Sequence, residues 1–539
     1  MYKYCESWKS TERVHFGQFP RMRAIRSHRR SLWDSCYISA RLEFEKTIRC
    51  FFKDMAVALG ENFLVAVNQF GVVLTCGQNE SGQLGVGLPH GVDTYQMQRI
   101  SLGNIKDDCE TNQRNVMVSA GYKHAAFVTR SGSVYTWGSD VHGQLGVGVV
   151  RQYFDSLAAS RLAHRTGKEH VFSQPIPRLA YSTGMGGSRA IMVACGREYT
   201  LLLTASGHVW GCGSNQYFQI GVQNMDDPLQ SRNRNRNITV FTMMPAARFD
   251  CGDGDPHIAF IAAGSDHSIA VGRNNGLLWT WGKGFGGKLG HGDGGRDHYA
   301  LVPTHLPQET FGEAVVSACA SDETSMAVTA SGALWVCGYS FTGKLGLGDV
   351  LHCNTFKRVD IADGFGDGGV RSVTCSAMHA LIVSHDGSVR MCGHTVSRGQ
   401  NYMVPTLIDP ACFNNEPVVL VSAGGMNSAA VTASGRLYTW GEERRDEYCG
   451  LACTHEFDPS ERMIQMSPRQ VQHIDLFGLW HYPLSDDEML AFAMGTHLRL
   501  GMETCFQTVP EEVLECIRGS SILPGASLFG VGLRNLLGI

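Results

Sequence analysis

The chain has 539 residues, of which 43% are apolar and 18% are charged, and its formal net charge is −4. This apolar content is enough for folded cores. The small net charge excludes a protein whose whole surface is basic and binds polyanions. No apolar run approaches the ~18 residues of a membrane-spanning helix and no signal-peptide pattern opens the chain, so we expect a soluble, intracellular protein without a membrane partner.

Eighteen cysteines in 539 residues are too few for a disulfide framework. Several occupy positions where a repeated pattern, described below, places a buried apolar residue, and a buried free cysteine behaves as a small apolar side chain. The cysteine content therefore predicts a reducing compartment, the cytoplasm or the nucleus.

The first 50 residues are basic. They hold 11 Lys or Arg against 5 Asp or Glu, a net +6, which leaves −10 for residues 51–539. Five arginines stand within ten residues: Arg21, Arg23, Arg26, Arg29 and Arg30. Such a run is suited to nucleic-acid phosphates or to an import receptor. The alternative is the solvated face of a short helix that docks through Met22, Ile25 and Trp33.

From residue 71 onward the chain repeats one pattern seven times, in which two glycines stand six residues apart. The pairs are Gly71/Gly77, Gly132/Gly138, Gly207/Gly213, Gly276/Gly282, Gly332/Gly338, Gly387/Gly393 and Gly435/Gly441. An apolar stretch precedes and follows the first glycine, as in HAAFVTRSG and then SVYTWG. This arrangement predicts a hairpin with a glycine turn, and a further short strand on each side gives four strands per unit.

The strand after the turn is apolar on both faces, which predicts burial between neighbouring sheets. The fifth position after the first glycine is Trp or Cys in every copy, and we expect these side chains to form the structural core of the repeat: Trp137, Trp281, Trp440, Cys76, Cys212, Cys337 and Cys392. A repeat of short strands that stack in this way is typical of a closed ring of blades, a β-propeller.

The longest interruptions of the repeat lie between residues 132 and 207 and between 207 and 276. The first holds an insertion at 150–180, which is either a tolerated loop or a partner-binding loop. Its basic residues are the candidate contacts: Arg151, Arg161, Arg165 and Lys168.

Several motifs resemble ligand sites, but the repeat accounts for them. Residues 282–289 and 338–345 come close to a phosphate-binding loop, yet Leu289 and Leu345 replace the Mg²⁺-binding hydroxyl. Three histidines occupy equivalent positions: His124, His267 and His379. Equivalent residues lie on different blades, so they do not form a metal site. Segments 449–455 and 251–257 lack a full zinc or calcium ligand set. We therefore expect no cofactor, no metal and no catalytic constellation.

Beyond the repeats, residues 486–501 echo the strands of a repeat and predict a strand that closes the ring. Residues 507–519 predict a helix, because Pro510 suits its first turn, Glu511 and Glu512 suit its positive end, and an apolar stripe follows.

The repeat resembles that of the RCC1 (regulator of chromosome condensation) family, which reads approximately AGxxHSxALTxxGxVYxWGxNxxGQLGxG. The likeness is strongest at 117–148 and 262–293 and extends over residues ~53–443. It implies an all-β, seven-bladed propeller. We expect a basic segment at 1–50, the propeller at 51–481 and a partly helical extension at 482–539.

The resemblance implies a function in binding. Members of this family include protein-interaction propellers, guanine-nucleotide exchange factors for small GTPases that dock on chromatin, and parts of ubiquitin ligases. We expect a non-enzymatic scaffold for a protein partner. The alternatives are an exchange factor, with chromatin docking through the basic segment, and a substrate adaptor of a ubiquitin ligase.

Overall fold

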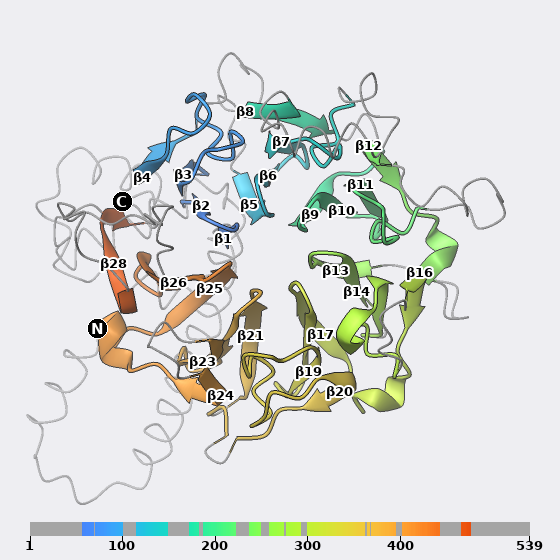
Figure 1. Ribbon diagram of the computed structural model, residues 1–539, viewed down its shortest axis with the longest axis vertical. Coiled ribbons are helices and arrows are strands. Elements are labelled where there is room, and N and C mark those ends of the chain that lie inside the picture. The colour runs from blue at the N-terminus through green and yellow to red at the C-terminus, as the bar shows by residue number, and fades with distance from the viewer. Residues whose placement is uncertain are drawn as a thin grey trace, which may run out of the picture. The chain divides into compact units, whose positions relative to one another are not determined.

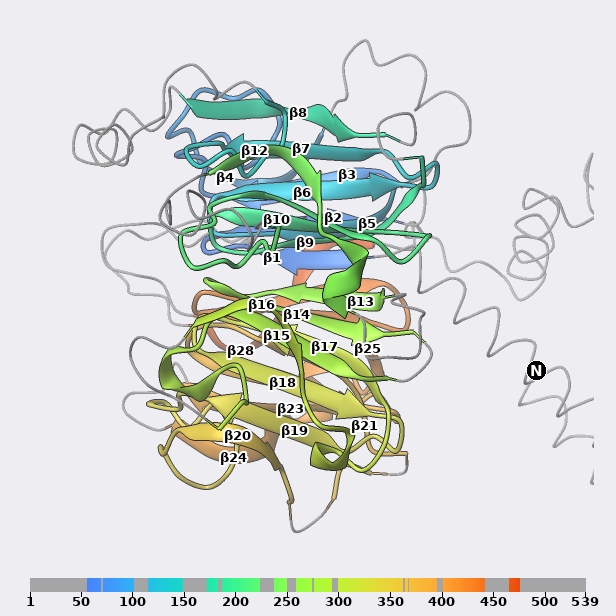
Figure 2. The same ribbon diagram turned by 90° about the vertical axis from the view of Figure 1, so that its right-hand side faces the viewer.

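Seven four-stranded antiparallel sheets surround a common axis in the computed structural model, and each sheet is built from four consecutive strands (Figure 1). The strands run roughly along the axis, and the blades lie side by side around it (Figure 2). The structure describes residues 56–475 except 69–70, 101–114, 149–171, 183–186, 223–236, 250–257, 274–275, 293–298, 362–363, 367, 395–400 and 442–464. The predicted seven-bladed β-propeller is thereby confirmed, whereas the predicted segments 1–50 and 482–539 lie outside the described residues.

Each blade contributes one strand to each of four positions, counted outward from the axis. The innermost strands are β1 Ala56–Leu59, β5 Asn115–Ala120, β9 Ala190–Cys195, β13 Ile258–Ala263, β17 Val315–Ala320, β21 Val370–Cys375 and β25 Val418–Gly424. The second strands are β2 Phe63–Val67, β6 His124–Thr129, β10 Tyr199–Thr204, β14 His267–Gly272, β18 Thr324–Thr329, β22 His379–Ser384 and β26 Asn427–Thr432. The third strands are β3 Val73–Gly77, β7 Val134–Ser139, β11 Val209–Gly213, β15 Leu278–Lys283, β19 Leu334–Gly338, β23 Val389–His394 and β27 Arg436–Gly441. The outer strands are β4 Thr94–Arg99, β8 Ser173–Tyr181, β12 Ile238–Met243, β16 Tyr299–His305, β20 Cys353–Arg358, β24 Asn401–Leu407 and β28 Gln465–Asp475.

Among the described residues, helical structure is limited to four short 3₁₀ turns: η3 Ala246–Phe249, η4 Phe285–Gly287, η5 Gln308–Thr310 and η6 Pro410–Phe413. No helix of this part of the chain has the length and apolarity required to cross a membrane. The segment at 282–289 that resembles a phosphate-binding loop contains the short turn η4 and is followed by His291, which bridges to Thr355, so no helix begins there as a phosphate-binding loop requires.

The two glycines of the repeat meet different structural needs. Gly132 adopts a φ of 88° at the hairpin turn between β6 and β7, where its N–H donates to the carbonyl of Thr129 at 2.9 Å. Gly138, six residues later, pairs with His124 across the ladder, and a Cβ there would lie 2.5 Å from the Lys123 carbonyl oxygen. The first glycine is therefore required by the turn, and the second by the close approach of the neighbouring strand.

Neighbouring blades are joined by the Trp or Cys at the end of each third strand. Trp137 and Trp281 are completely buried, and their indole N–H groups donate to the backbone carbonyls of Gln83 and Gln219 in the preceding blade, at 2.8 and 2.9 Å. The other blades use a thiol for the same contact. The sulfur atoms of Cys212, Cys337 and Cys392 lie 3.1–3.5 Å from the equivalent backbone carbonyl of the preceding blade, that of Gln144, Lys288 and Lys344 respectively. Trp440 is 4% exposed and Cys76 is fully buried.

The three equivalent histidines join blades and do not meet one another. His124, His267 and His379 are buried, and the Nε2 atom of each lies 2.8–3.0 Å from a Thr or Ser hydroxyl of the next blade. No group of three or more His, Cys, Asp or Glu side chains in the described part of the chain could hold a metal ion.

The ring closes between the first and seventh blades through their innermost strands. The N–H of Leu59 donates to Ser422 Oγ at 3.0 Å, although 363 residues separate them. The fourth position of the seventh blade is filled by β28. The predicted closing strand at 486–501 and the predicted helix at 507–519 lie outside the described residues.

Candidate functional site

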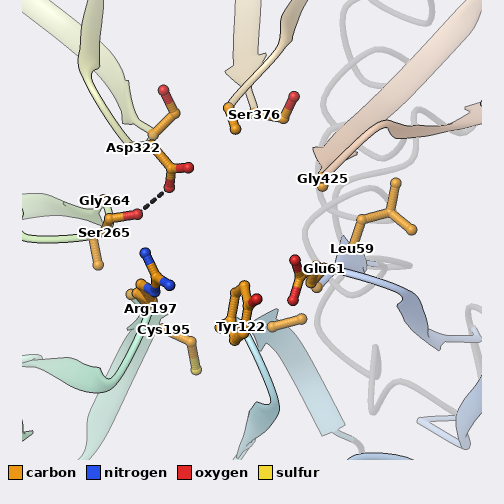
Figure 3. Close-up of a pocket in the computed structure, with 18 of the residues that line it drawn as sticks. Leu59, Glu61, Tyr122, Cys195, Arg197, Gly264, Ser265, Asp322, Ser376 and Gly425 are labelled. Atoms are coloured by element: carbon orange, nitrogen blue, oxygen red, sulfur yellow. Dashed lines mark hydrogen bonds between the residues drawn. The ribbon is translucent and has the colours of Figure 1, made fainter. Parts of the chain in front are cut away.

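Seven turns converge on the axis at one end of the ring, where each connects the first and second strands of a blade (Figure 3). They line an open pocket of about 180 Å³, which we call the axial pocket. Its lining consists of three residues from every blade: 59–61, 120–122, 195–197, 263–265, 320–322, 375–377 and 423–425. We call this end of the ring the turn face.

The second residue of the triplet is a glycine in five blades, and crowding around the axis constrains it. A Cβ on Gly196 would lie 2.6 Å from the carbonyl oxygen of Gly264 in the next blade, and a Cβ on Gly60 would lie 2.7 Å from that of Gly121. Glycine permits this approach because it has no Cβ, and serine takes its place only in the fifth and sixth blades, as Ser321 and Ser376.

The third residue of the triplet projects into or beside the opening and differs in every blade: Glu61, Tyr122, Arg197, Ser265, Asp322, Ala377 and Gly425. The guanidinium carbon of Arg197 lies 4.9 Å from the centre of the Tyr122 ring, a cation–π distance. The hydroxyl of Ser265 donates to the Asp322 carboxylate (Figure 3). The same turn of the seven blades thus displays six different side chains and one glycine.

The charges around the opening are unevenly distributed. The third residues and their immediate successors hold five carboxylates and two cations: Glu61, Glu198, Asp266, Asp322, Glu323, Lys123 and Arg197. Three of the carboxylates, Asp266, Asp322 and Glu323, belong to the fourth and fifth blades. Burial opposes the charge of Arg197, but Glu198, Tyr122, Asp322 and Asp266 outweigh burial and raise its pKa. Arg197 is therefore a firmly cationic point beside an acidic sector.

Sequence models of the "Regulator of chromosome condensation (RCC1) repeat" match this chain at residues 117–144 and 193–219, and again at 131–203 and 275–328. The matched segments contain the turn, the paired glycines and the buried Trp or Cys described above. The chain is an RCC1-repeat propeller.

Curated relatives share the repeat at moderate identity. The chain is 27% identical over 430 residues to the ultraviolet-B receptor UVR8 of Arabidopsis thaliana, covering 78% of this chain and 85% of the relative. It is 26% identical over 349 residues to the human RCC1-like G exchanging factor-like protein, covering 62% and 69%. The crystal structure of Prp20p from Saccharomyces cerevisiae has a TM-score of 0.53 at 20% identity, covering 69% and 80%, and this likeness concerns the fold alone.

Two buried lysines lie beneath the acidic sector of this RCC1-repeat propeller. Lys288 and Lys344 are each 1% exposed, and their ammonium groups donate to backbone carbonyls of the next blade's turn, those of Asp322 at 2.7 Å and Ala377 at 2.8 Å. Burial lowers the pKa of Lys288 to about 8 and also lowers that of Lys344. In the first three blades the same position holds a glutamine, whose side-chain oxygen accepts a local backbone N–H: Gln83, Gln144 and Gln219.

We expect Lys288→Gln to stabilise the propeller at about pH 7 by up to about 3 kcal/mol, because the lysine regains its ordinary pKa of 10.5 only when the chain unfolds. Between pH 8 and 10.5 the unfolded chain binds a proton that the folded chain does not, so the stability of the wild type rises with pH. Urea unfolding across this range should show the two proteins converging as the pH rises. The exposed Lys357→Gln serves as control, and a constant difference between wild type and Lys288→Gln would contradict the expectation.

The residues proposed from sequence as contacts lie in parts of the chain that the structure does not describe. The arginines at 21–30 and the basic residues at 151–168 lie outside the described residues. The insertion nevertheless joins the propeller at the turn face, since Ser139 at the end of β7 pairs with Ser173 at the start of β8. The variable pocket residues were missed. No pattern within a single repeat marks them, because the two residues before them also vary, from Leu59-Gly60 in the first blade to Cys375-Ser376 in the sixth.

Proposed function

We propose that this chain is a non-enzymatic protein-interaction propeller that binds its partner across the turn face. The observation that carries this proposal is the third residue of each pocket triplet, where the same backbone turn presents a different residue in every blade, six side chains and one glycine. Crowding around the axis requires the glycine that is the second residue in five blades, whereas the third residue ranges from glycine to arginine. Variation on a rigid, repeated frame is the arrangement by which repeat proteins specify a partner.

The size of the axial pocket favours a protein over a small molecule. About 180 Å³ is below the roughly 300–1,000 Å³ of pockets that enclose drug-sized ligands. It can accept one side chain of a protein whose surface rests on the surrounding turns. Asp266 is paired with Lys283 at 3.4 Å, and Asp322 and Glu323 favour a lysine or arginine of the partner at the fifth blade, because opposite charges are complementary across an interface.

Two further observations support a basic partner. Residues 51–539 carry a formal charge of −10, so the part of the chain that holds the propeller attracts cationic proteins at long range. Prp20p, which shares the fold, is described as binding Gsp1p and histones, and histones are basic proteins.

The proposal predicts that reversing charge at the axial pocket strongly reduces partner capture. The variant Glu61→Lys with Asp322→Lys should capture about tenfold less partner than the wild type, or less still, in quantitative affinity capture, since close interfacial charges contribute ~1 kcal/mol or more each. The matched control is Asp360→Lys, at the other end of the ring next to Arg358. Equal capture of the same proteins by all three would overturn the proposal.

A guanine-nucleotide exchange factor is the second candidate. It is favoured by the relative named RCC1-like G exchanging factor-like protein and by an insertion that joins the propeller at the turn face. The test is nucleotide release from a panel of small GTPases with the full chain at micromolar concentration. Acceleration of one GTPase would support exchange, and no acceleration leaves the scaffold as the function.

The basic segment and the C-terminal extension carry separate proposals. Nucleic-acid or import-receptor binding through residues 21–30 predicts that a chain lacking residues 1–50 loses salt-dependent partners that the full chain captures. Ubiquitin-ligase adaptor function predicts that the capture of ligase components requires residues 484–539. Capture with each truncated chain beside the full chain distinguishes these proposals from binding at the turn face.

A further inference from the structure

A hydrogen bond between neighbouring innermost strands recurs around the ring. Ser119 Oγ of the second blade accepts the N–H of Cys195 in the third blade at 2.9 Å. Ser422 Oγ of the seventh blade accepts the N–H of Leu59 in the first blade at 3.0 Å, which closes the ring. In both pairs the serine stands two residues before the turn glycine of its own blade. The residue whose N–H it accepts stands one residue before the turn glycine of the neighbouring blade.

Between the fifth and sixth blades, cysteines occupy both of these positions. Cys319 stands where Ser119 and Ser422 stand in their blades, and Cys375 stands where Cys195 does. Their sulfur atoms lie 3.0 Å apart, at hydrogen-bond distance between two thiols. A disulfide has an S–S length of about 2 Å, so an approach of about 1 Å would form the bond.

We propose that Cys319 and Cys375 are a reversible oxidation site, at which a hydroperoxide joins the fifth and sixth blades through a disulfide. The Cys375 thiol loses its proton, the thiolate attacks one peroxide oxygen and the O–O bond breaks. The leaving hydroxide or alkoxide takes up that proton, so the products are a sulfenic acid and water, or an alcohol from an organic hydroperoxide. The Cys319 thiol then attacks the Cys375 sulfur, the S–O bond breaks, and water leaves with the thiol proton. Two thiols are oxidised and one peroxide is reduced, and a dithiol reverses the reaction.

The surroundings of the pair assign Cys375 as the attacking group. The hydrogen bond with Cys319 and the nearby Lys344 ammonium lower the pKa of Cys375 although burial raises it, whereas burial and the same hydrogen bond raise the pKa of Cys319. Lys344 is fixed in place by its hydrogen bond to the Ala377 carbonyl in the same turn. Cys375 also lines the axial pocket, which gives a small oxidant a route from solvent.

Cys195 provides a control within the same molecule. Cys195 occupies the position in its blade that Cys375 occupies in the sixth blade. Both side chains are 7% exposed, and both line the axial pocket. Its neighbour is Ser119, which cannot form a disulfide, and burial raises the pKa of Cys195 to about 12. Exposure alone therefore predicts equal oxidation of the two cysteines, whereas the proposal predicts oxidation of Cys375 only.

The experiment treats the full chain with hydrogen peroxide, blocks the remaining thiols with an alkylating reagent and maps the peptides by mass spectrometry without reduction. We expect loss of alkylation at Cys319 and Cys375, a linked peptide that joins them, recovery of both with dithiothreitol, and an alkylated Cys195. Full alkylation of Cys319 and Cys375 after peroxide treatment, or oxidation of Cys195 to the same extent as Cys375, would overturn the proposal.

Two variants extend the test and should both fold, because each uses a residue pair already tolerated in the ring. Cys319→Ser restores the serine of other blades and removes the second thiol, so peroxide should leave a sulfenic acid on Cys375 that dimedone traps. Ser119→Cys creates the same pair beside Cys195, and peroxide should then link residues 119 and 195. Absence of the dimedone adduct on Cys375 would contradict its assignment as the attacking thiol, and absence of the 119–195 link would contradict the claim that paired thiols at this joint suffice.

Discussion

Replacing Trp281 by alanine is expected to lower the free energy of unfolding by about 3–5 kcal/mol. The indole is completely buried, packs edge-on against Phe249 with ring centres 5.9 Å apart, and donates to the Gln219 carbonyl of the preceding blade. Its removal leaves a cavity at the joint between two blades, and the flanking backbone cannot close it because both strands are held in their ladders. The loss is a large part of the ~5–15 kcal/mol that typically stabilises a domain.

The measurement is the urea midpoint and slope of the variant against the wild type. Trp335→Ala is the matched control, because Trp335 is only half-buried and occupies the third position after the turn glycine, so we expect a smaller loss. An unchanged midpoint for Trp281→Ala would contradict the role assigned to the Trp or Cys position in joining blades.

Acidification from about pH 6.5 to about pH 4 is expected to unfold the propeller through its buried histidines. Burial lowers the pKa of His124 and of His379 from 6.5 to about 4, and lowers that of His267 as well. In this window the unfolded chain binds protons that the folded chain does not, so the stability present above pH 6.5 is lost as the pH falls. Each of the first two histidines contributes about 3 kcal/mol to this loss.

Two variants separate the histidines from other acid-sensitive groups. His379→Asn introduces the residue that the seventh blade carries at Asn427, and it should reduce the loss on acidification. Asp140 has the opposite effect on stability. Burial raises its pKa to about 7, so as the pH falls below 7 the folded chain binds a proton that the unfolded chain does not yet bind, and this binding stabilises the folded chain. Asp140→Asn, the residue of the first and third blades, should make the acid transition steeper. Identical pH profiles for wild type and His379→Asn would refute the mechanism.

The architecture could be predicted because the residues that form it are the ones that repeat. Gly132 and Gly138 are required by a turn and by a close strand, and both requirements recur in every blade. The strand that begins at Val134 is apolar on both faces, and this pattern predicts its burial between neighbouring sheets. Four strands per blade and seven blades followed from the spacing, and the structure confirms them.

The axial pocket could not be predicted by the same reasoning, because its variable residues carry no local signal. Glu61, Arg197 and Asp322 are far apart in sequence, and each looks like an ordinary polar residue in a loop. Their proximity follows only from the closed ring, in which the same turn of every blade reaches the axis. Conversely, the arginine run at 21–30 stands out in sequence, but it lies outside the described residues and remains a prediction.

Each blade consists of one uninterrupted stretch of chain, and the joint between the first and seventh blades uses the same serine-to-backbone hydrogen bond as the joint between the second and third. The ring therefore has no special seam. The unit of sequence and the unit of structure coincide, so an in-frame duplication or deletion of one repeat would add or remove a whole blade without cutting a hydrogen-bonded ladder. Rings of different blade number, and thus of different central width, are accessible from such a sequence by single genetic steps.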